Sequence, residues 1–267
     1  MTFASMIAAL SLYPWNLGVN FVHIIGTSSA THHYSANGAY IVLDRRDKDL
    51  LLFGYEKLNI RYTGVDFVQE LAMVRTSDWL WRSFRPGIVA ASLTSNDVDG
   101  GECVGLRVDG DVWRIGYSAS HQTGHWRWYD WATAGQTGEA IHQSDLQLRY
   151  NFDFVSLTAN SILSNSPSLN LQYGTMTCSW HPWTILDLSL QYGQGDSRFQ
   201  TDWTALTVDN NPDNLTKNWK AKVAFTPLPQ AGITAAWVKK FYSSTDPASP
   251  TGSYSVNFWV AGLQIRI

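Results

Sequence analysis

Residues 145–150 read Asp-Leu-Gln-Leu-Arg-Tyr, and this alternation of polar and apolar side chains decides the fold class. The same alternation recurs at 57–62 (Lys-Leu-Asn-Ile-Arg-Tyr), 186–192 (Leu-Asp-Leu-Ser-Leu-Gln-Tyr) and 219–225 (Trp-Lys-Ala-Lys-Val-Ala-Phe). Successive side chains of a β-strand point to opposite faces, so each segment forms a strand with one apolar and one polar face. None of them has helical spacing. The sequence therefore predicts an all-β protein.

The composition narrows the kinds of all-β protein that remain. Only 15% of the 267 residues are charged, against about 25% in an ordinary soluble domain, and Trp occurs 13 times. The mean hydropathy is −0.17. No apolar run approaches the roughly 20 residues of a membrane-spanning helix, which excludes helical membrane proteins. A net charge of −3 without a block of like charge argues against nucleic acid as a partner.

The connections between these strand-like segments are alternately short and long along the chain. Short turns are expected at 46–48, 109–111, 151–153, 181–182 and 227–230, and longer polar loops at 27–37, 96–101, 122–143, 195–214 and 243–252. Such an alternation is typical of outer-membrane barrels, whose periplasmic turns are short and whose extracellular loops are long. The sequence thus predicts a transmembrane antiparallel up-and-down β-barrel of about 14 strands, with 12 to 16 allowed by the weak pattern at 60–85.

The whole chain, residues 1–267, is expected to form one barrel domain. Residues 1–13 are expected to form an N-terminal tail, a small plug or an extra strand. Two polar segments, 124–132 and 199–208, carry Trp126, Trp128, Trp131 and Trp203. They are candidates for strand extensions that form a β-rich rim above the membrane.

The end of the chain, 259–267, reads Trp-Val-Ala-Gly-Leu-Gln-Ile-Arg-Ile, with alternate residues from Trp259 to Ile267 on one apolar face. This segment resembles the closing strand of Gram-negative outer-membrane β-barrel proteins, the porin-like superfamily, although Ile267 stands where Phe is usual. The resemblance covers the architecture and matches no individual porin family. It implies residence in the bacterial outer membrane, with the lipid bilayer as a partner.

A soluble carbohydrate-binding sandwich stays open as the less favoured alternative, because lectin-like domains are also rich in Trp, Tyr and Gly. In a barrel, the ionised residues opposite the apolar face would line the lumen, where water can meet them. These lumen candidates are Lys57, Arg61, Asp66, Glu70, Arg107, Arg114, Asp145, Arg149, Asp187, Lys220, Lys222 and Arg266.

Aromatic residues near strand ends fit the two interfaces of a membrane, because Trp and Tyr rings are apolar with one polar atom. The expected interface aromatics are Trp113, Tyr117, Trp183, Trp219 and Trp259.

The histidines and cysteines show no metal-binding spacing. His32, His33, His121 and His125 could gather at the outer rim, but neither an HExxH motif nor a Cys/His spacing supports a metal. We expect no metal and no cofactor. The two cysteines, Cys103 and Cys178, are expected to be unpaired.

Serine and histidine pairs are the only candidates for catalysis. An acyl hydrolase would need them close together at the membrane edge, and Ser118 or Ser120 with His121 or His142 is conceivable. Any serine-rich barrel offers such pairs, so we expect no catalytic residue and no enzyme.

The leading functional hypothesis is a channel for passive or weakly selective passage of small solutes. Fourteen strands enclose a lumen wider than that of side-chain-filled eight-stranded barrels. The lumen candidates include eight basic and four acidic residues, which predicts a mild preference for anions, with sugar-like solutes also plausible.

An apolar run on the inward face of the last strand favours the alternative hypothesis. Tyr254, Val256, Phe258 and Val260 could line an apolar route, seat a plug or contact a protein. The alternative is a scaffold barrel that houses or anchors a protein partner in its lumen or at its rim, such as an export component or an electron-carrying cytochrome.

Overall fold

The computed structural model describes residues 16–29, 33–45, 48–62, 65–77, 83–95, 100–130, 135–203, 207–244 and 252–266. These residues form fourteen strands. The strands are β1 (Asn16–Ser28), β2 (His33–Arg45), β3 (Lys48–Tyr62), β4 (Val65–Thr76), β5 (Arg85–Ser95), β6 (Gly100–Val112), β7 (Ile115–Asp130), β8 (Gly135–Asn151), β9 (Val155–Asn165), β10 (Asn170–Trp183), β11 (Leu186–Asp202), β12 (Thr207–Leu228), β13 (Ala231–Ser243) and β14 (Ser253–Arg266).

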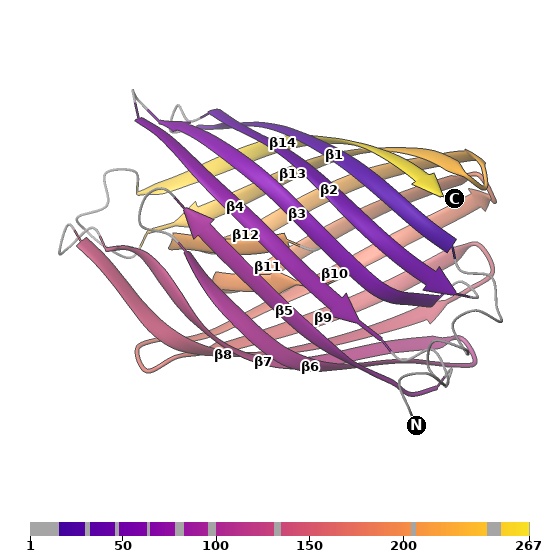
Figure 1. Ribbon diagram of the computed structural model, residues 1–267, viewed down its shortest axis with the longest axis horizontal. Coiled ribbons are helices and arrows are strands. Elements are labelled where there is room, and N and C mark those ends of the chain that lie inside the picture. The colour runs from indigo at the N-terminus through magenta and orange to yellow at the C-terminus, as the bar shows by residue number, and fades with distance from the viewer. Residues whose placement is uncertain are drawn as a thin grey trace, which may run out of the picture.

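Every strand pairs antiparallel with the next one along the chain, and the sheet closes on itself. The closing pair is β1 with β14, in which Gly18 lies opposite Arg266 and Ser28 opposite Val256. Figure 1 shows the resulting wall, with β1 to β4 crossing obliquely in front of β11 to β13. The predicted fold class and the count of fourteen are confirmed. No helix of the described residues is long and apolar enough to cross a membrane.

The two ends of the barrel differ in their connections. At one end, here called the turn end, β6 and β7 are joined by Trp113 and Arg114, and β12 and β13 by Pro229 and Gln230. The first strand starts and the last strand finishes at this end, as an even strand number requires. We call the opposite end the loop end. Residues 1–13, the expected tail, plug or extra strand, lie outside the described residues.

Much of the polar sequence predicted as loop is strand. At the loop end β7 continues to Asp130 and β8 starts at Gly135, so the segment around Trp126 and Trp128 extends the wall. Trp126 and Trp128 are nearly fully buried and therefore point into the barrel. Trp131 lies outside the described residues.

An apolar band surrounds the outside of the barrel. On β12 the outward residues Trp219, Val223, Phe225 and Leu228 are all exposed, and Lys217 marks the beginning of the polar surface above them. The nine steps from Trp219 to Leu228 span roughly 30 Å of strand, and at a tilt of about 40° they cover roughly 23 Å along the barrel axis. That height agrees with the apolar band of about 25 Å in transmembrane barrels.

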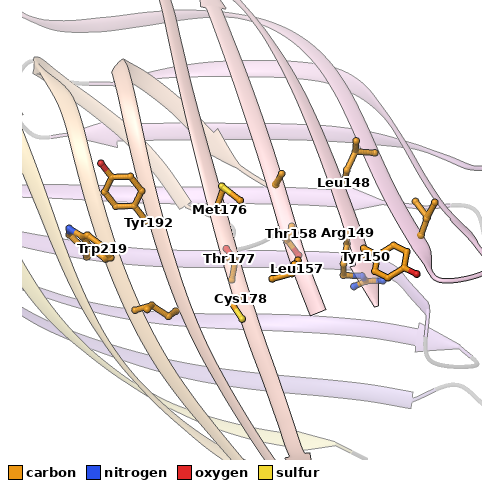
Figure 2. Close-up of a pocket in the computed structure, with 13 residues that line it drawn as sticks. Leu148, Arg149, Tyr150, Leu157, Thr158, Met176, Thr177, Cys178, Tyr192 and Trp219 are labelled. Atoms are coloured by element: carbon orange, nitrogen blue, oxygen red, sulfur yellow. The ribbon is translucent and has the colours of Figure 1, made fainter. Parts of the chain in front are cut away.

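The outward face also contains a shallow apolar groove of about 440 Å³ across β7 to β12. Figure 2 shows Tyr192 and Trp219 on one side of this groove, Leu148 and Tyr150 on the other, and Met176 between them. Met176 is 68% exposed, which an aqueous surface would disfavour and a hydrocarbon environment favours. The groove is thus part of the lipid-facing band.

Candidate functional site: the barrel lumen and its inward hairpin

The most unusual feature of the lumen is that the ends of β11 and β12 turn into it. The β11–β12 register shifts between Gln194 and Ser197 and again before Phe199, and Gly195 adopts a φ of 139° that favours glycine. Beyond this bulge Phe199, Thr201 and Trp203 are 2%, 1% and 0% exposed. We call the described residues 197–203 and 207–213 the lumen hairpin.

Two glutamines, on β7 and β8, bind Thr201 in the first arm of the lumen hairpin. The Gln143 Nε2 donates to the Thr201 carbonyl oxygen at 3.1 Å, and the Thr201 amide donates to Gln143 Oε1 at 3.1 Å. Gln122 Nε2 also donates to Thr201 Oγ1. A buried backbone segment needs partners for its N–H and C=O groups, and the side-chain amide of Gln143 supplies both, as a neighbouring strand would.

Two further hydrogen bonds attach the hairpin to the wall on either side of Thr201. The hydroxyl of Ser164 on β9 donates to the Phe199 carbonyl at 3.2 Å, and Arg75 Nη1 on β4 donates to the Trp203 carbonyl at 3.2 Å. The five hydrogen bonds come from four strands, β4, β7, β8 and β9. The lumen hairpin is therefore anchored across much of one side of the barrel.

Apolar packing fills the space between the lumen hairpin and that side. The rings of Trp128 and Phe199 lie 4.6 Å apart, and Trp203 is enclosed completely. The other buried members of this cluster are Leu52, Leu71, Met73, Val89, Ala91, Leu93, Cys103, Trp126 and Ile141. Their near-zero exposure shows that they form a packed core and do not line an open passage.

Nearer the turn end, the wall from β5 to β8 carries ion pairs. Asp111 accepts from Arg85 Nη1 at 3.0 Å and from Arg149 Nη2 at 3.2 Å. Arg107, only 6% exposed, binds the carboxylate of Asp109 through Nε at 3.0 and 3.1 Å and through Nη2 at 2.9 Å. These charges are matched locally, as burial requires. We call this side the paired wall.

The side formed by β12 and β13 is different, because its inward charges include several lysines. Lys220 and Lys222 follow each other on the inward face of β12, and Lys240 faces inward on β13 opposite Asn218. Asp202 of the lumen hairpin, Lys222 and Lys240 lie near Lys220. Among the described residues, neither Lys220 nor Lys222 has a carboxylate within ion-pair distance. We call this side the lysine wall.

Aromatic side chains lie beside the lysine wall, on β13, β14 and β2. The rings of Tyr242 and Tyr254 stack at 5.1 Å, and Tyr34 meets Phe258 edge to face at 5.5 Å. The ammonium of Lys240 lies 5.9 Å from the centre of the Phe258 ring. The run from Tyr254 to Val260 therefore faces inward, as the sequence predicts, and Tyr254, Val256 and Phe258 belong to an apolar cluster.

Seven of the predicted lumen residues lie on the inward face of the described strands. They are Arg107, Asp145, Arg149, Asp187, Lys220, Lys222 and Arg266. Asp145 faces Asp202, Arg107 and Asp109, so it borders the lumen hairpin. Asp187 pairs with His181 at 3.3 Å near the turn end. Arg114 lies in the β6–β7 turn instead, where it binds Asp153 of the next turn at 3.2 Å.

Three predicted lumen residues lie on the outward face, which corrects the assignment. Lys57 and Glu70 form an ion pair at 2.9 Å with nearly half of each side chain exposed, and Arg61 follows on the same face of β3. The prediction assumed that the polar face of every strand is the lumen face. Here the inward face of β3 carries Leu52, which packs in the core, and the loop end of the strand rises above the apolar band. Of Asp66 only the backbone is described.

The predicted interface aromatics lie on the outward face or in turns. Trp113 and Trp183, at the turn end, are 76% and 65% exposed, and Trp259 is also 65% exposed. Tyr117 donates its hydroxyl to the Ser83 carbonyl at 2.5 Å. Trp219 contacts Tyr192 at 4.6 Å, just below the polar loop-end surface. The turn after β10 falls later than predicted, because the strand accommodates Pro182 at a register shift and continues to Trp183.

The serine and histidine candidates are separated by the wall. Ser118 and Ser120 are buried on the inward face, whereas His121 and His142 lie exposed on the outward face. His121 instead contacts the Ser144 hydroxyl at 3.0 Å, and its ring stacks on His142 at 6.3 Å. Within the described residues, no three His, Cys, Asp or Glu side chains are grouped to hold a metal. Of the two free cysteines, Cys103 is buried and Cys178 faces outward.

Several lumen residues escaped prediction, notably Arg75, Gln122, Gln143 and Lys240. A signal for the lumen hairpin was present in β7, whose inward residues change from serine and glutamine to Trp126 and Trp128. Two large apolar side chains would not be expected on the inward face of a wall that contacts only water. Such a change predicts that something fills the barrel at that height.

Comparison with solved structures agrees with this architecture. The monoaromatic hydrocarbon channel CymD superposes with a TM-score of 0.56 at 7% sequence identity, over 97% of this chain and 90% of CymD. The Pseudomonas putida toluene transporter TodX superposes with a TM-score of 0.54 at 10% identity, over 100% of this chain and 93% of TodX. This chain shares the barrel fold of these two channels. No protein-family model matches the chain, and no curated protein matches it by sequence.

Proposed function

We propose that this porin-like barrel is an outer-membrane channel for small solutes, with a passage along the lysine wall that prefers anions. The observation that carries this proposal is the difference between the two sides of the lumen. Arginines of the paired wall are neutralised by Asp109 and Asp111, whereas Lys220 and Lys222 have no carboxylate at ion-pair distance among the described residues. A passage lined by unmatched positive charge concentrates anions.

The anion preference rests on partly different residues from those that the sequence indicated. Lys57 and Arg61 lie outside the lumen, and Lys240 joins Lys220 and Lys222 inside it. Acidic residues are also present inside, among them Glu56, which accepts a hydrogen bond from the Tyr40 hydroxyl at 2.8 Å. We therefore expect a selective wall, not a uniformly positive lumen.

Two other functions are less favoured by the lumen. CymD and TodX carry hydrocarbons by name, but the large apolar residues inside this barrel are buried against the lumen hairpin and offer little free apolar surface. A scaffold barrel would need room for its partner. The lumen hairpin takes up part of that room at the loop end, since Phe199 packs on Trp128 of β7 and the Trp203 carbonyl is bound by Arg75 of β4.

Planar-bilayer recording of the purified protein tests the proposal. We expect ohmic current steps and, in a KCl gradient, a reversal potential that reports chloride preferred over potassium. The double variant Lys220→Gln/Lys222→Gln should lose this preference. Lys57→Gln is the matched control, because Lys57 is an outward lysine paired with Glu70. Absence of current steps, or an unchanged reversal potential in the double variant, would refute the channel or its selectivity respectively.

A further inference from the structure

The geometry points to a binding site on the outside of the barrel for a lipid of the outer leaflet whose headgroup carries a phosphate. The acyl chain lies in the apolar groove across β7 to β12, and the phosphate binds Lys217 and Gln194 at the loop end of that groove. This ligand belongs to the outer face of the barrel, so the site does not depend on any passage through the lumen.

The groove follows one row of outward residues that crosses five strands. The register pairs Trp219 of β12 with Tyr192, Tyr192 with Met176, Met176 with Ala159, and Ala159 with Leu148 of β8. Neighbouring strands are about 4.8 Å apart, so the row is roughly 19 Å long. Ala159 lies between the larger side chains of Met176 and Leu148, which Figure 2 shows, and its small side chain leaves the groove open. The length and the apolar lining suit a fatty acyl chain.

The row climbs across the membrane from the turn end toward the loop end. On β8, Leu148 lies three residues before the strand ends at Asn151. On β12, Trp219 lies nine residues before the strand ends at Leu228. The loops of a transmembrane barrel are extracellular, so the Trp219 end of the groove reaches the outer leaflet. A chain in the groove therefore places its headgroup beside Trp219 and Tyr192, at the height where aromatic rings favour the membrane interface.

Hydrogen-bond donors stand at this end of the groove. Lys217 is the next outward residue of β12 beyond Trp219, and it lies opposite Gln194 of β11. The Tyr192 hydroxyl donates to Gln194 Oε1 at 2.6 Å, so the oxygen of this amide is used and its NH₂ group remains as a donor. Among the described residues, neither the Lys217 ammonium nor Gln194 Nε2 has a hydrogen bond or an ion pair. Asp196, two residues beyond Gln194, is exposed and forms no ion pair with Lys217.

A phosphate suits these donors better than an uncharged or zwitterionic headgroup. Its oxygens accept hydrogen bonds, and it carries the charge opposite to that of Lys217. Lys239, the diagonal neighbour of Lys217 on β13, adds positive charge nearby, although its ammonium stands over the Phe241 ring at 5.0 Å. Free phosphate would use only the donors, and an uncharged lipid would use only the groove. A phosphate-bearing lipid uses both.

Native mass spectrometry of the full-length barrel in detergent, titrated with lipids of known structure, tests the site. Dimyristoyl phosphatidic acid should bind about fivefold more tightly than dimyristoyl phosphatidylcholine, which has the same acyl chains and no net charge. Dibutyryl phosphatidic acid has the same headgroup on short chains, and it should bind at least about tenfold more weakly than the dimyristoyl form. Inorganic phosphate at equal concentration should not displace the dimyristoyl form.

Two substitutions separate the contributions of the headgroup and the acyl chain. Lys217→Gln should remove most of the preference for dimyristoyl phosphatidic acid and leave the binding of dimyristoyl phosphatidylcholine unchanged. Ala159→Trp should fill the groove and weaken both lipids by a similar factor. Lys57→Gln is the matched control for Lys217→Gln, because Lys57 is an outward lysine that is already paired with Glu70.

Heat-dependent gel mobility verifies that each variant is folded. Equal affinities of the unmodified barrel for the two dimyristoyl lipids would overturn the site, as would an undiminished preference in Lys217→Gln. Full binding of both lipids by Ala159→Trp would overturn the placement of the acyl chain in the groove. Displacement by inorganic phosphate would show that the donors bind a free anion and that no lipid is recognised.

Discussion

Replacing Gln143 by Ala should release the lumen hairpin and make the channel open more often. The substitution removes two hydrogen bonds of 3.1 Å to the backbone of Thr201, a residue that is only 1% exposed. Each bond contributes about 1 kcal/mol net, and a buried backbone group left without a partner costs about 1–3 kcal/mol. The docked hairpin should thus be destabilised by about 2–4 kcal/mol.

Because about 1.4 kcal/mol corresponds to a tenfold change in population, the undocked hairpin should become roughly 30- to 1,000-fold more frequent. Single-channel recordings would show this as frequent excursions to a larger conductance. Gln147→Ala is the matched control. Gln147 has the same side chain on the same inward face of β8, two inward positions nearer the turn end than Gln143. It has no hydrogen bond to the hairpin among the described residues. If Gln143→Ala and Gln147→Ala give identical conductance and gating, the hairpin does not restrict the passage and the reasoning fails.

Three substitutions, with one rescue variant and one surface control, test the barrel through the urea concentration at the midpoint of its unfolding in detergent or lipid. Trp203→Ala should lower the stability by about 3–5 kcal/mol, because the side chain is fully buried. Arg107→Leu should lower the free energy of unfolding by about 3–5 kcal/mol, because it leaves the buried Asp109 carboxylate without its partner. Adding Asp109→Asn should recover much of this loss of stability. Val223→Arg, in the middle of the apolar band, should cost about 2–4 kcal/mol in lipid. Thr123→Arg, on the polar outward surface, should cost less than about 1 kcal/mol; equal costs for these two would contradict the position of the membrane.

The wall of the barrel was predictable because it depends on local alternation. The segments 145–150 and 219–225 each repeat with a period of two, and a strand that faces lipid on one side needs nothing else. Their alternating burial in β8 and β12 follows the pattern of the sequence. The same logic explains why inward Lys220 and Lys222 could be named from sequence alone.

The interior was less predictable because it depends on contacts between distant segments. Gln143 and Thr201 are 58 residues apart, and nothing in either local sequence indicates that one binds the other. Lys57 shows that the assignment of a strand's inward face has the same limit. Its strand alternates regularly, but which face is inward depends on the core around Leu52 and on the height of the membrane, neither of which a single strand encodes.

The lumen hairpin links the width of the passage to its charge. Asp202 lies on the hairpin and is the acidic neighbour of Lys220, so the element that narrows the lumen also neutralises part of the lysine wall. When the hairpin undocks, Asp202 moves away from Lys220 and the wall becomes more positive while the passage becomes wider. A simple plug would change conductance alone, and a simple change of charge would alter selectivity alone. In this barrel, any perturbation of the Gln143–Thr201 contact should raise conductance and anion preference together, because one segment controls both.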